Sequence, residues 1–234
     1  MVLYLVLVAW VASVILWNTA LNVSAGDGGP SKKWNTSQVA AIVMGKNEEK
    51  ALPRLLDSLK GVVSYVFVCD TGSTDETKQV FFQHAMAGEF RYIGEFHDFE
   101  TSRNLCMNAA RLRLSTDKEW ILLPDADFTL QANSQLSQPE YDINIVRIET
   151  GGAALQNHLP LLVRARAFFG QCRYRLWTHE ILDCCTSANL TTGYYNDVWF
   201  IDHADGGNRP ARLERDIRLL EEWLQHYGQM RGQS

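Results

Sequence analysis

The sequence predicts an α/β fold: a Rossmann-type, mostly parallel central sheet flanked by helices, followed by a less regular C-terminal half. Three observations lead to this class. Short apolar runs alternate with stretches of helical periodicity, polar clusters follow three of those runs, and the spacing becomes irregular beyond Phe128. The 234 residues, 46% hydrophobic and 21% charged, have the composition of an ordinary folded chain.

The first predicted strand is Val39 to Met44, whose continuous apolar character is typical of a strand buried on both faces. A polar loop follows at 45–49, and four leucines then recur at helical spacing between residues 52 and 59. The domain is therefore expected to begin with a strand, a polar loop and a helix.

The same alternation continues along the chain. Further strands are expected at Tyr65–Cys69, Phe90–Phe96 and Trp120–Leu123, and helices from Ser73 to about Met86 and from Ser102 to Arg111. Ser73 followed by Glu76 is a capping box for the first of these helices. Ligands of such sheets bind beyond the carboxyl ends of the strands, so the polar clusters after them should meet at one rim.

The C-terminal half is predicted to build the second wall of a cleft. Its expected strands are Ile143–Ile148, Leu161–Ala165, Cys172–Trp177 and Val198–Ile201. Pro210 starts a final amphipathic helix that ends near Tyr227. We interpret the charges of this helix as a solvated face, although Arg212 and Arg215 would approach phosphate if this helix end faces the cleft.

The N-terminal segment has the character of a targeting signal. Residues 2–17 are apolar but for one serine, and Val23-Ser24-Ala25 matches a signal-peptidase site. The alternative is an uncleaved membrane anchor; Lys32 and Lys33 after it would favour a cytosol-facing domain. We expect 1–25 to be a signal peptide or membrane anchor, 26–37 a linker, 38–228 the folded domain and 229–234 a tail. The expected location is the lumen of the secretory pathway, secreted or membrane-anchored.

The net charge and the spacing of the cysteines exclude several classes of protein. The net charge of -5 excludes a protein built to bind nucleic acid. The five cysteines contain no C-x-x-C pair, which excludes a zinc ribbon or a thioredoxin site. In an oxidising lumen, Cys172 would pair with Cys184 or Cys185, whereas Cys69 is interpreted as a packing residue in its strand.

Asp125-Ala126-Asp127 places two carboxylates at the end of a buried strand, where alternate side chains point to the same side. Hard divalent cations such as Mg²⁺ or Mn²⁺ are held by one or two carboxylates and leave positions open for substrate phosphates. The same segment also resembles the nucleophile motif of haloacid-dehalogenase-type phosphatases. That family needs a downstream lysine, and no lysine follows Lys118.

A different resemblance accounts for the upstream elements as well. The motifs Lys46-Asn47-Glu48-Glu49, 70–77 (DTGSTDET), Ser102-Arg103-Asn104 and 120–127 (WILLPDAD), each placed after a strand or in a helix, resemble a family 2 glycosyltransferase with a GT-A fold. The segments 177–180 (WTHE) and 203–209 (HADGGNR) are similar to the C-terminal half of its smaller bacterial, viral and algal members. The resemblance covers roughly residues 38–225, so 38–228 is expected to be a GT-A domain.

This resemblance implies a donor site. Asp70 would accept hydrogen bonds from the nucleotide base, with Asn47 and Glu48 lining the same pocket. Arg103 would reach the diphosphate or the base edge, and Asp125 would contact the ribose or the metal. The alternatives are that Asp70 merely forms a turn and that Arg103 is a solvated helix charge.

The resemblance also implies a metal and a base. Asp127 would be the main ligand of Mn²⁺ or Mg²⁺, with Asp125 and, from the far wall, His203 as further ligands. Glu180 would be the general base, and His179 would orient it or bind the acceptor. The expected partners are a nucleoside diphosphate sugar, with a UDP-sugar favoured, and a glycan or glycoconjugate acceptor. A binding module that kept the fold and lost turnover is the non-enzymatic alternative.

Overall fold

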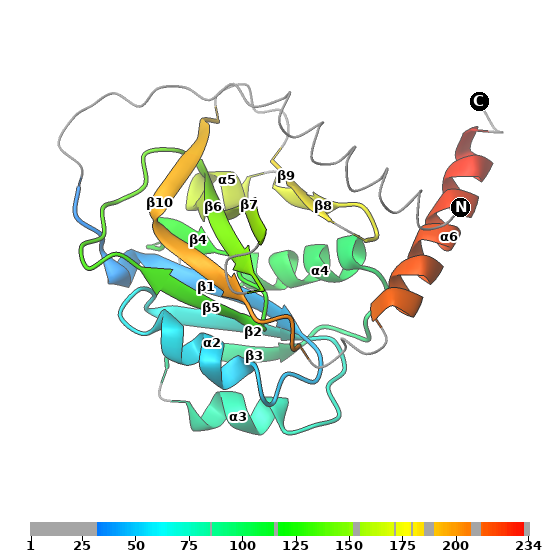
Figure 1. Ribbon diagram of the computed structural model, residues 1–234, viewed down its shortest axis with the longest axis horizontal. Helices are drawn as coiled ribbons and strands as arrows, with labels where there is room; N and C mark the ends of the chain where they lie inside the picture. Colours follow the sequence, from blue (N-terminus) through cyan, green and yellow to red (C-terminus); the bar gives the residue numbers. More distant parts are fainter. Residues whose placement is uncertain are drawn as a thin grey trace.

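The computed structural model describes residues 32–84, 86–114, 117–151, 155–170, 172–178, 180–184, 190–206 and 212–231. In this part of the chain one large sheet has the strand order β3-β2-β1-β4-β7-β6-β10-β5 (Figure 1). Its strands are β1 (Val39–Gly45), β2 (Tyr65–Asp70), β3 (Gly88–Tyr92), β4 (Trp120–Leu122), β5 (Phe128–Ala132), β6 (Ile143–Thr150), β7 (Leu155–Arg164) and β10 (Thr192–Asp202).

The N-terminal half of this sheet is parallel. β1 pairs with β2 and β4, and β2 pairs with β3, all in the parallel sense. Parallel neighbours need crossover connections, which here contain α2 (Leu52–Leu59), α3 (Thr77–Gln83) and α4 (Phe99–Arg111). Helices α2 and α3 pack in the core on one face, and α4 packs on the other with α5 (Ala165–Phe169). The predicted α/β class, with helices on both faces, is confirmed.

The C-terminal half of the sheet is mixed. β7 runs antiparallel to both β4 and β6, whereas β10 is parallel to β6 and antiparallel to β5. Only residues 151–154 separate β6 from β7, and such a short connection forces an antiparallel hairpin. In Figure 1, β6, β7 and β10 rise away from β1 and β2, so that the sheet curls.

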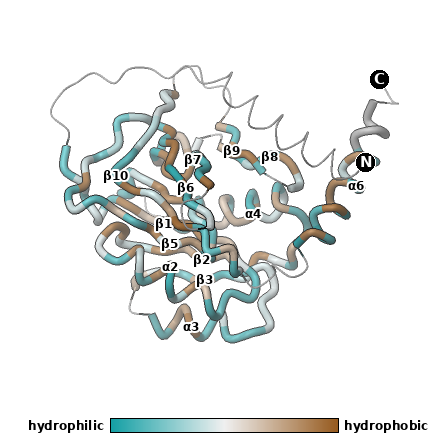
Figure 2. Tube along the Cα trace, in the orientation of Figure 1, coloured by the Kyte–Doolittle hydropathy of each residue, from teal (hydrophilic) through white to brown (hydrophobic). Residues whose placement is uncertain are grey.

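A two-stranded sheet of β8 (Arg173–Arg175) and β9 (Ile181–Asp183) packs beside α4. The Cys172–Cys184 disulfide closes the base of this hairpin, which agrees with one of the two pairings expected from the sequence. The final helix, α6 (Arg212–Arg231), extends to one side of the molecule (Figure 1). Figure 2 shows hydrophobic and hydrophilic segments alternating along it.

Some local predictions are corrected. Cys69 is not simply a packing residue, because it forms a disulfide with Cys106 of α4 and so ties that helix to β2.

The bounds and caps of several elements also differ from the prediction. Ser73 does not cap α3, because the N-cap of this helix is Glu76, which makes no side-chain capping bond. The Ser73 hydroxyl instead accepts the backbone N–H of Asn47. The predicted strand Leu161–Ala165 is the end of β7, which runs from Leu155 to Arg164, and Ala165 is instead the first residue of α5. The strand β5 is not predicted by the sequence.

The start of the described chain packs onto the fold. The Trp34 indole stacks on Tyr195 at 6.2 Å and donates to the Val62 carbonyl. Residues 1–31, which include the predicted targeting segment, as well as Cys185 and Pro210, lie outside the described residues. Within the described part of the chain, no helix combines the length and hydrophobicity needed to cross a membrane.

Candidate active site

A cavity of about 580 Å³ opens at the carboxyl ends of β1, β2 and β4. Glu48, Thr71 and Asp125 line it, one from each of the three loops that follow these strands. Its far wall comes from β6, β7, β10, the β8–β9 hairpin and α6. The predicted convergence of three polar loops on one rim is therefore observed, and the C-terminal half supplies the second wall.

Arg103 is the centre of this cavity's charge network. From α4, its Nη2 donates to Asp125 and its Nε donates to Glu180 at 2.5 Å. Its side chain is 11% exposed and lies over the Tyr174 ring at 5.1 Å. Burial would lower the pKa of Arg103, but Asp125 and Glu180 outweigh it and hold that pKa well above its usual value. Burial also raises the pKa of Tyr174 to about 12.

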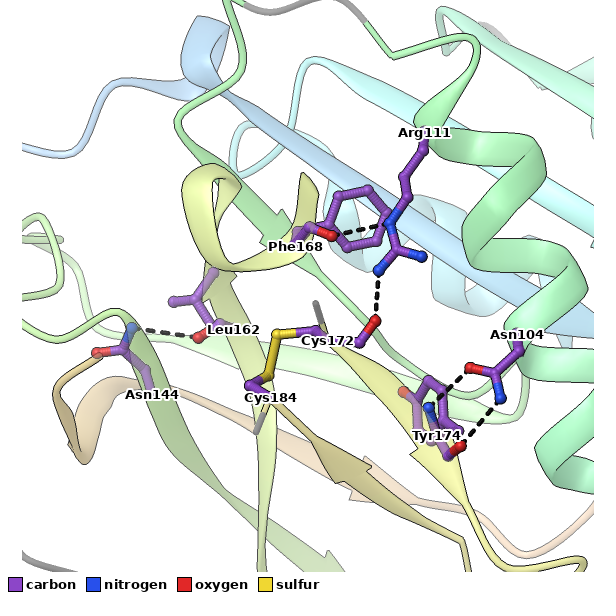
Figure 3. Close-up of a disulfide and its surroundings, with 8 residues drawn as sticks. All are labelled: Asn104, Arg111, Asn144, Leu162, Phe168, Cys172, Tyr174 and Cys184. Carbon is purple, nitrogen blue, oxygen red and sulfur yellow. Dashed lines mark hydrogen bonds between the residues drawn. A yellow bond between two sulfur atoms is a disulfide. The ribbon is translucent and has the colours of Figure 1, made fainter. Parts of the chain in front are cut away.

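The loop that carries Glu180 is held by α4. The Asn104 side chain both donates to the Tyr174 carbonyl and accepts its backbone N–H, at 2.9 and 2.8 Å (Figure 3). One turn earlier, the Glu100 carboxylate accepts the N–H of Leu176 at 2.7 Å. Leu176 has a φ of 77°, which is costly for a residue with a side chain. The Glu100 bond therefore stabilises a strained backbone four residues before the predicted base.

The hairpin is also anchored at its base. Arg111, at the end of α4, donates to the carbonyls of Phe168 and Cys172, and the Cys172–Cys184 disulfide lies beside this contact (Figure 3). The segment with Glu180 thus lies between two fixed points, the α4 contacts and the disulfide.

Asp127 contacts the segment after β10 and helix α2. Its Oδ2 accepts the Gly206 N–H at 3.3 Å, and its backbone carbonyl accepts from Arg54 of α2 at 3.5 Å. Arg54 also makes a two-point ion pair with Asp205 at 2.6 and 3.0 Å, and this bond lowers the pKa of Asp205. Arg54 thereby fixes the 205–206 backbone against Asp127.

Gly206 is a close-packed position. A Cβ added there would lie 3.2 Å from both Asp127 Oδ2 and Glu48 Oε1. Glycine therefore lets these two carboxylates approach the 206 backbone from adjacent loops.

The predicted base-binding residues mainly shape their loops. Asp70 accepts the N–H groups of Gly72 and Ser73 through its carboxylate, and Asn47 accepts the N–H of Thr74 at 2.8 Å. Neither Asp70 nor Asn47 lines the cavity, whereas Glu48 does. Asp70 therefore forms a turn, which is the alternative role considered for it in the sequence analysis.

The predicted metal ligands are brought only partly together. Asp125 and Asp127 both line the cavity, and their carboxylate oxygens are donors that suit Mg²⁺ or Mn²⁺. The His203 Nε2 lies 2.7 Å from the Thr129 hydroxyl, and His203 does not line the cavity. In the part of the chain that the structure describes, no three His, Cys, Asp or Glu side chains form a cluster that could hold a metal. His179 lies outside the described residues.

Several residues of the site were missed by sequence reasoning. Tyr174 was placed in a strand with no role, Arg54 was part of a helical pattern, and Phe96 and Phe99, which line the cavity, had no motif. Their roles come from contacts with residues distant in sequence, which no local pattern indicates. Trp177, the first residue of the 177–180 (WTHE) segment, stacks on His226 of α6 at 5.8 Å.

Comparison with known proteins decides the family. Residues 41–156, which contain Arg103, Asp125 and Asp127, match glycosyl transferase family 2. This chain belongs to glycosyltransferase family 2. The membership assigns the Asp125–Asp127 motif to a glycosyltransferase domain, so the phosphatase interpretation is set aside.

Relatives of this family 2 glycosyltransferase are distant. A TPR repeat-containing protein of Synechococcus elongatus is 31% identical over 155 residues, covering 63% of this chain and 36% of that protein. An uncharacterized glycosyltransferase of Rickettsia felis is 26% identical over 199 residues, covering 81% of this chain and 62% of that protein. The chain thus spans less than two thirds of either relative. Among solved structures, S. aureus TarS shares 13% identity with a TM-score of 0.47, covering 70% of this chain and 36% of that one.

Proposed function

We propose that this protein is a metal-dependent, inverting glycosyltransferase. It would move a sugar from a nucleoside diphosphate sugar, with a UDP-sugar favoured, to an acceptor hydroxyl on a glycan or glycoconjugate. The observation that carries the proposal is the joining of Asp125 and Glu180 by the buried Arg103 in one cavity with Asp127. Membership of family 2 supports it.

In this proposal the donor lies along the rim formed by the three loops. Glu48, Asp125 and Arg103 line the cavity and would contact the nucleotide directly. Asp70 and Asn47 would act through the backbone that they order, because their side chains are engaged with the 72–74 turn. A planar guanidinium such as that of Arg103 also suits contact with phosphate or a base edge.

The residues present fit a divalent cation that arrives with the donor. Asp127, with Asp125, would hold Mn²⁺ or Mg²⁺, and phosphate oxygens would complete its coordination. His203 would join only after its ring leaves Thr129, whose hydroxyl now lies at 2.7 Å. When bound, such a cation supplies positive charge that stabilises the departing diphosphate.

Glu180 is the proposed general base. Its carboxylate would take the proton of the acceptor hydroxyl while the acceptor oxygen forms a bond to the anomeric carbon. The bond from that carbon to the diphosphate breaks at the same time, and its electron pair leaves with the diphosphate. A single displacement of this kind inverts the anomeric configuration. Arg103 and the α4 contacts to the 174–177 backbone would keep Glu180 oriented toward this carbon.

The proposed location is the lumen of the secretory pathway, secreted or membrane-anchored. The disulfides Cys69–Cys106 and Cys172–Cys184 support it, because such bonds persist in oxidising compartments.

Thermal unfolding in the presence of nucleotides tests the donor site. The protein is heated with UDP, GDP, TDP or CMP, each with and without Mn²⁺, beside the Asp127→Asn variant. A ligand at 100 times its dissociation constant adds ~2.7 kcal/mol to the free energy of unfolding. We expect a metal-dependent shift with one nucleoside diphosphate, and a smaller shift in the variant. No shift with any nucleotide would contradict the proposed donor site.

A further inference from the structure

The beginning of α6 faces the cavity. Arg212, Arg215 and Asp216 all line it, although the sequence favoured a solvated face for this helix. Arg218, on the next turn, does fit a solvated face: its side chain is 64% exposed, and it does not line the cavity. The first turns of α6 therefore contribute two arginines to the cavity wall.

Arg215 is held in place by aromatic rings. Its guanidinium carbon lies 4.7 Å from the Phe99 ring centre and 5.7 Å from that of Phe96. Its side chain is 20% exposed, and stacking on aromatic faces orients a guanidinium. Phe99 is the first residue of α4, and Arg103 lies one turn further on the same helix. Arg215 is therefore positioned near the helix that carries Arg103.

A second contact places Gly206 against Asp127. The Gly206 N–H donates to Asp127 Oδ2 at 3.3 Å, and Arg212 follows six positions later in the sequence. Asp127, Arg212 and Arg215 all line the same cavity.

The charges of this cluster are unequal. The Asp216 carboxylate accepts from Arg215 at 2.9 and 3.0 Å, and Arg212 Nε lies 3.5 Å from it. One carboxylate therefore serves two guanidiniums, which leaves one net positive charge in this cluster of Arg212, Arg215 and Asp216. Each guanidinium has five N–H donors in a planar fork that matches the oxygens of phosphate.

We propose that Arg212 and Arg215 form a subsite that binds the diphosphate of the donor. This inference deepens the proposed function and rests on it. Asp216 occupies guanidinium donors that the phosphate oxygens would take over on binding. The arginines thereby also stabilise the negative charge that develops on the leaving diphosphate.

Calorimetric titration of the full chain tests this subsite. The probes are the nucleoside diphosphate that stabilises the protein most in the thermal panel, its parent nucleoside and inorganic pyrophosphate, all with Mg²⁺. Arg212→Gln and Arg215→Gln are expected to weaken binding of the diphosphate probes about tenfold and to leave nucleoside binding unchanged. Arg218→Gln, on the same helix, is the matched control and should bind like the wild type.

Asp216→Asn separates charge from packing. Removing this carboxylate should tighten binding of the diphosphate probes, whereas a defect in helix packing would weaken it. Unchanged diphosphate affinity in both arginine variants would overturn the subsite, as would a loss in Asp216→Asn equal to theirs. If the folded wild type binds pyrophosphate through these arginines but no nucleotide, the proposed function fails and the anion subsite stands.

Discussion

Arg103 Nε donates to Glu180 Oε1 at 2.5 Å, although 77 positions separate the two residues in the sequence. The same guanidinium donates to Asp125 through Nη2. The buried guanidinium of Arg103 therefore sets the spacing between Asp125, in the loop after β4, and Glu180, the predicted base in the C-terminal half. The relative positions of these two carboxylates depend on the two bonds.

Replacing Arg103 by lysine should disrupt that spacing. A lysine keeps the charge but has a single nitrogen, which cannot bond two carboxylates in the fixed geometry of a guanidinium. We expect kcat for transfer to fall about 100-fold. Steady-state kinetics with a matched Arg113→Lys control, a half-exposed arginine outside the cavity, measures the effect. A wild-type kcat in Arg103→Lys would show that the bridge has no role in positioning.

Replacing Glu180 by glutamine should remove the proton acceptor without changing the shape of the site. The expected loss of kcat is roughly 10²- to 10⁴-fold, with nucleotide affinity retained. Glu221→Gln on α6 is the control, because Glu221 is exposed and does not line the cavity. If Glu180→Gln transfers sugar at the wild-type rate, the base is another residue.

The disulfide Cys172–Cys184 should restrain the hairpin that carries Glu180. It closes a sequence separation of 12 residues, for which loop-closure entropy gives about 3 kcal/mol. Replacing both cysteines by serine should therefore speed amide hydrogen exchange at residues 173–183, with β1 (Val39–Gly45) as the internal reference. Unchanged exchange in the hairpin would mean that the α4 contacts alone hold it.

Asp142 should make stability depend on pH. Its buried carboxylate accepts two bonds from Arg166, at 2.6 and 2.7 Å, and one from the Thr191 N–H. Burial alone would raise the pKa of Asp142, but these bonds outweigh it and lower that pKa. A lowered pKa in the folded state stabilises the fold above the unfolded value of about 3.9, and the contribution is lost as the pH falls through the folded value.

Asp142→Asn is therefore expected to lower the free energy of unfolding by about 2 kcal/mol at pH 7. The difference from the wild type should shrink below about pH 4. Urea unfolding across this range measures it. Asp57→Asn is the control: Asp57 is exposed and pairs with Lys60 at the surface, where such pairs contribute little. A deficit that does not change with pH would contradict an ionic origin.

The strands that are buried on both faces were predictable, because such burial leaves a simple pattern in the sequence. β1, β2 and β4 are covered on both faces, so each is a continuous apolar run in the sequence. β5 was missed because it is a strand of five residues, directly after the Asp125–Asp127 motif, in which buried and partly buried residues alternate instead of forming a continuous apolar run. The antiparallel β6–β7 pairing depends on a short connection that no motif marks.

The sequence predicts the candidate residues of the site but not the partners that hold them in place. Asp125, Asp127, Arg103 and Glu180 all follow from motifs, and all line one cavity. Their partners do not follow, because Arg54 and Tyr174 act across long separations in the chain. Arg215 shows the same limit: its charge fits a solvated helix face, and only its contact with Phe99 places it at the cavity.

The most direct test of the central claim is the release of nucleoside diphosphate from a panel of nucleotide sugars, measured with Mn²⁺ and without an added acceptor. Water then takes the place of the acceptor hydroxyl, so the acceptor need not be known. We predict slow, metal-dependent release from at least one nucleotide sugar by the wild type, and its loss in both Asp127→Asn and Glu180→Gln. A folded protein that binds the nucleotide but releases none from any sugar donor would contradict catalysis and identify a binding module.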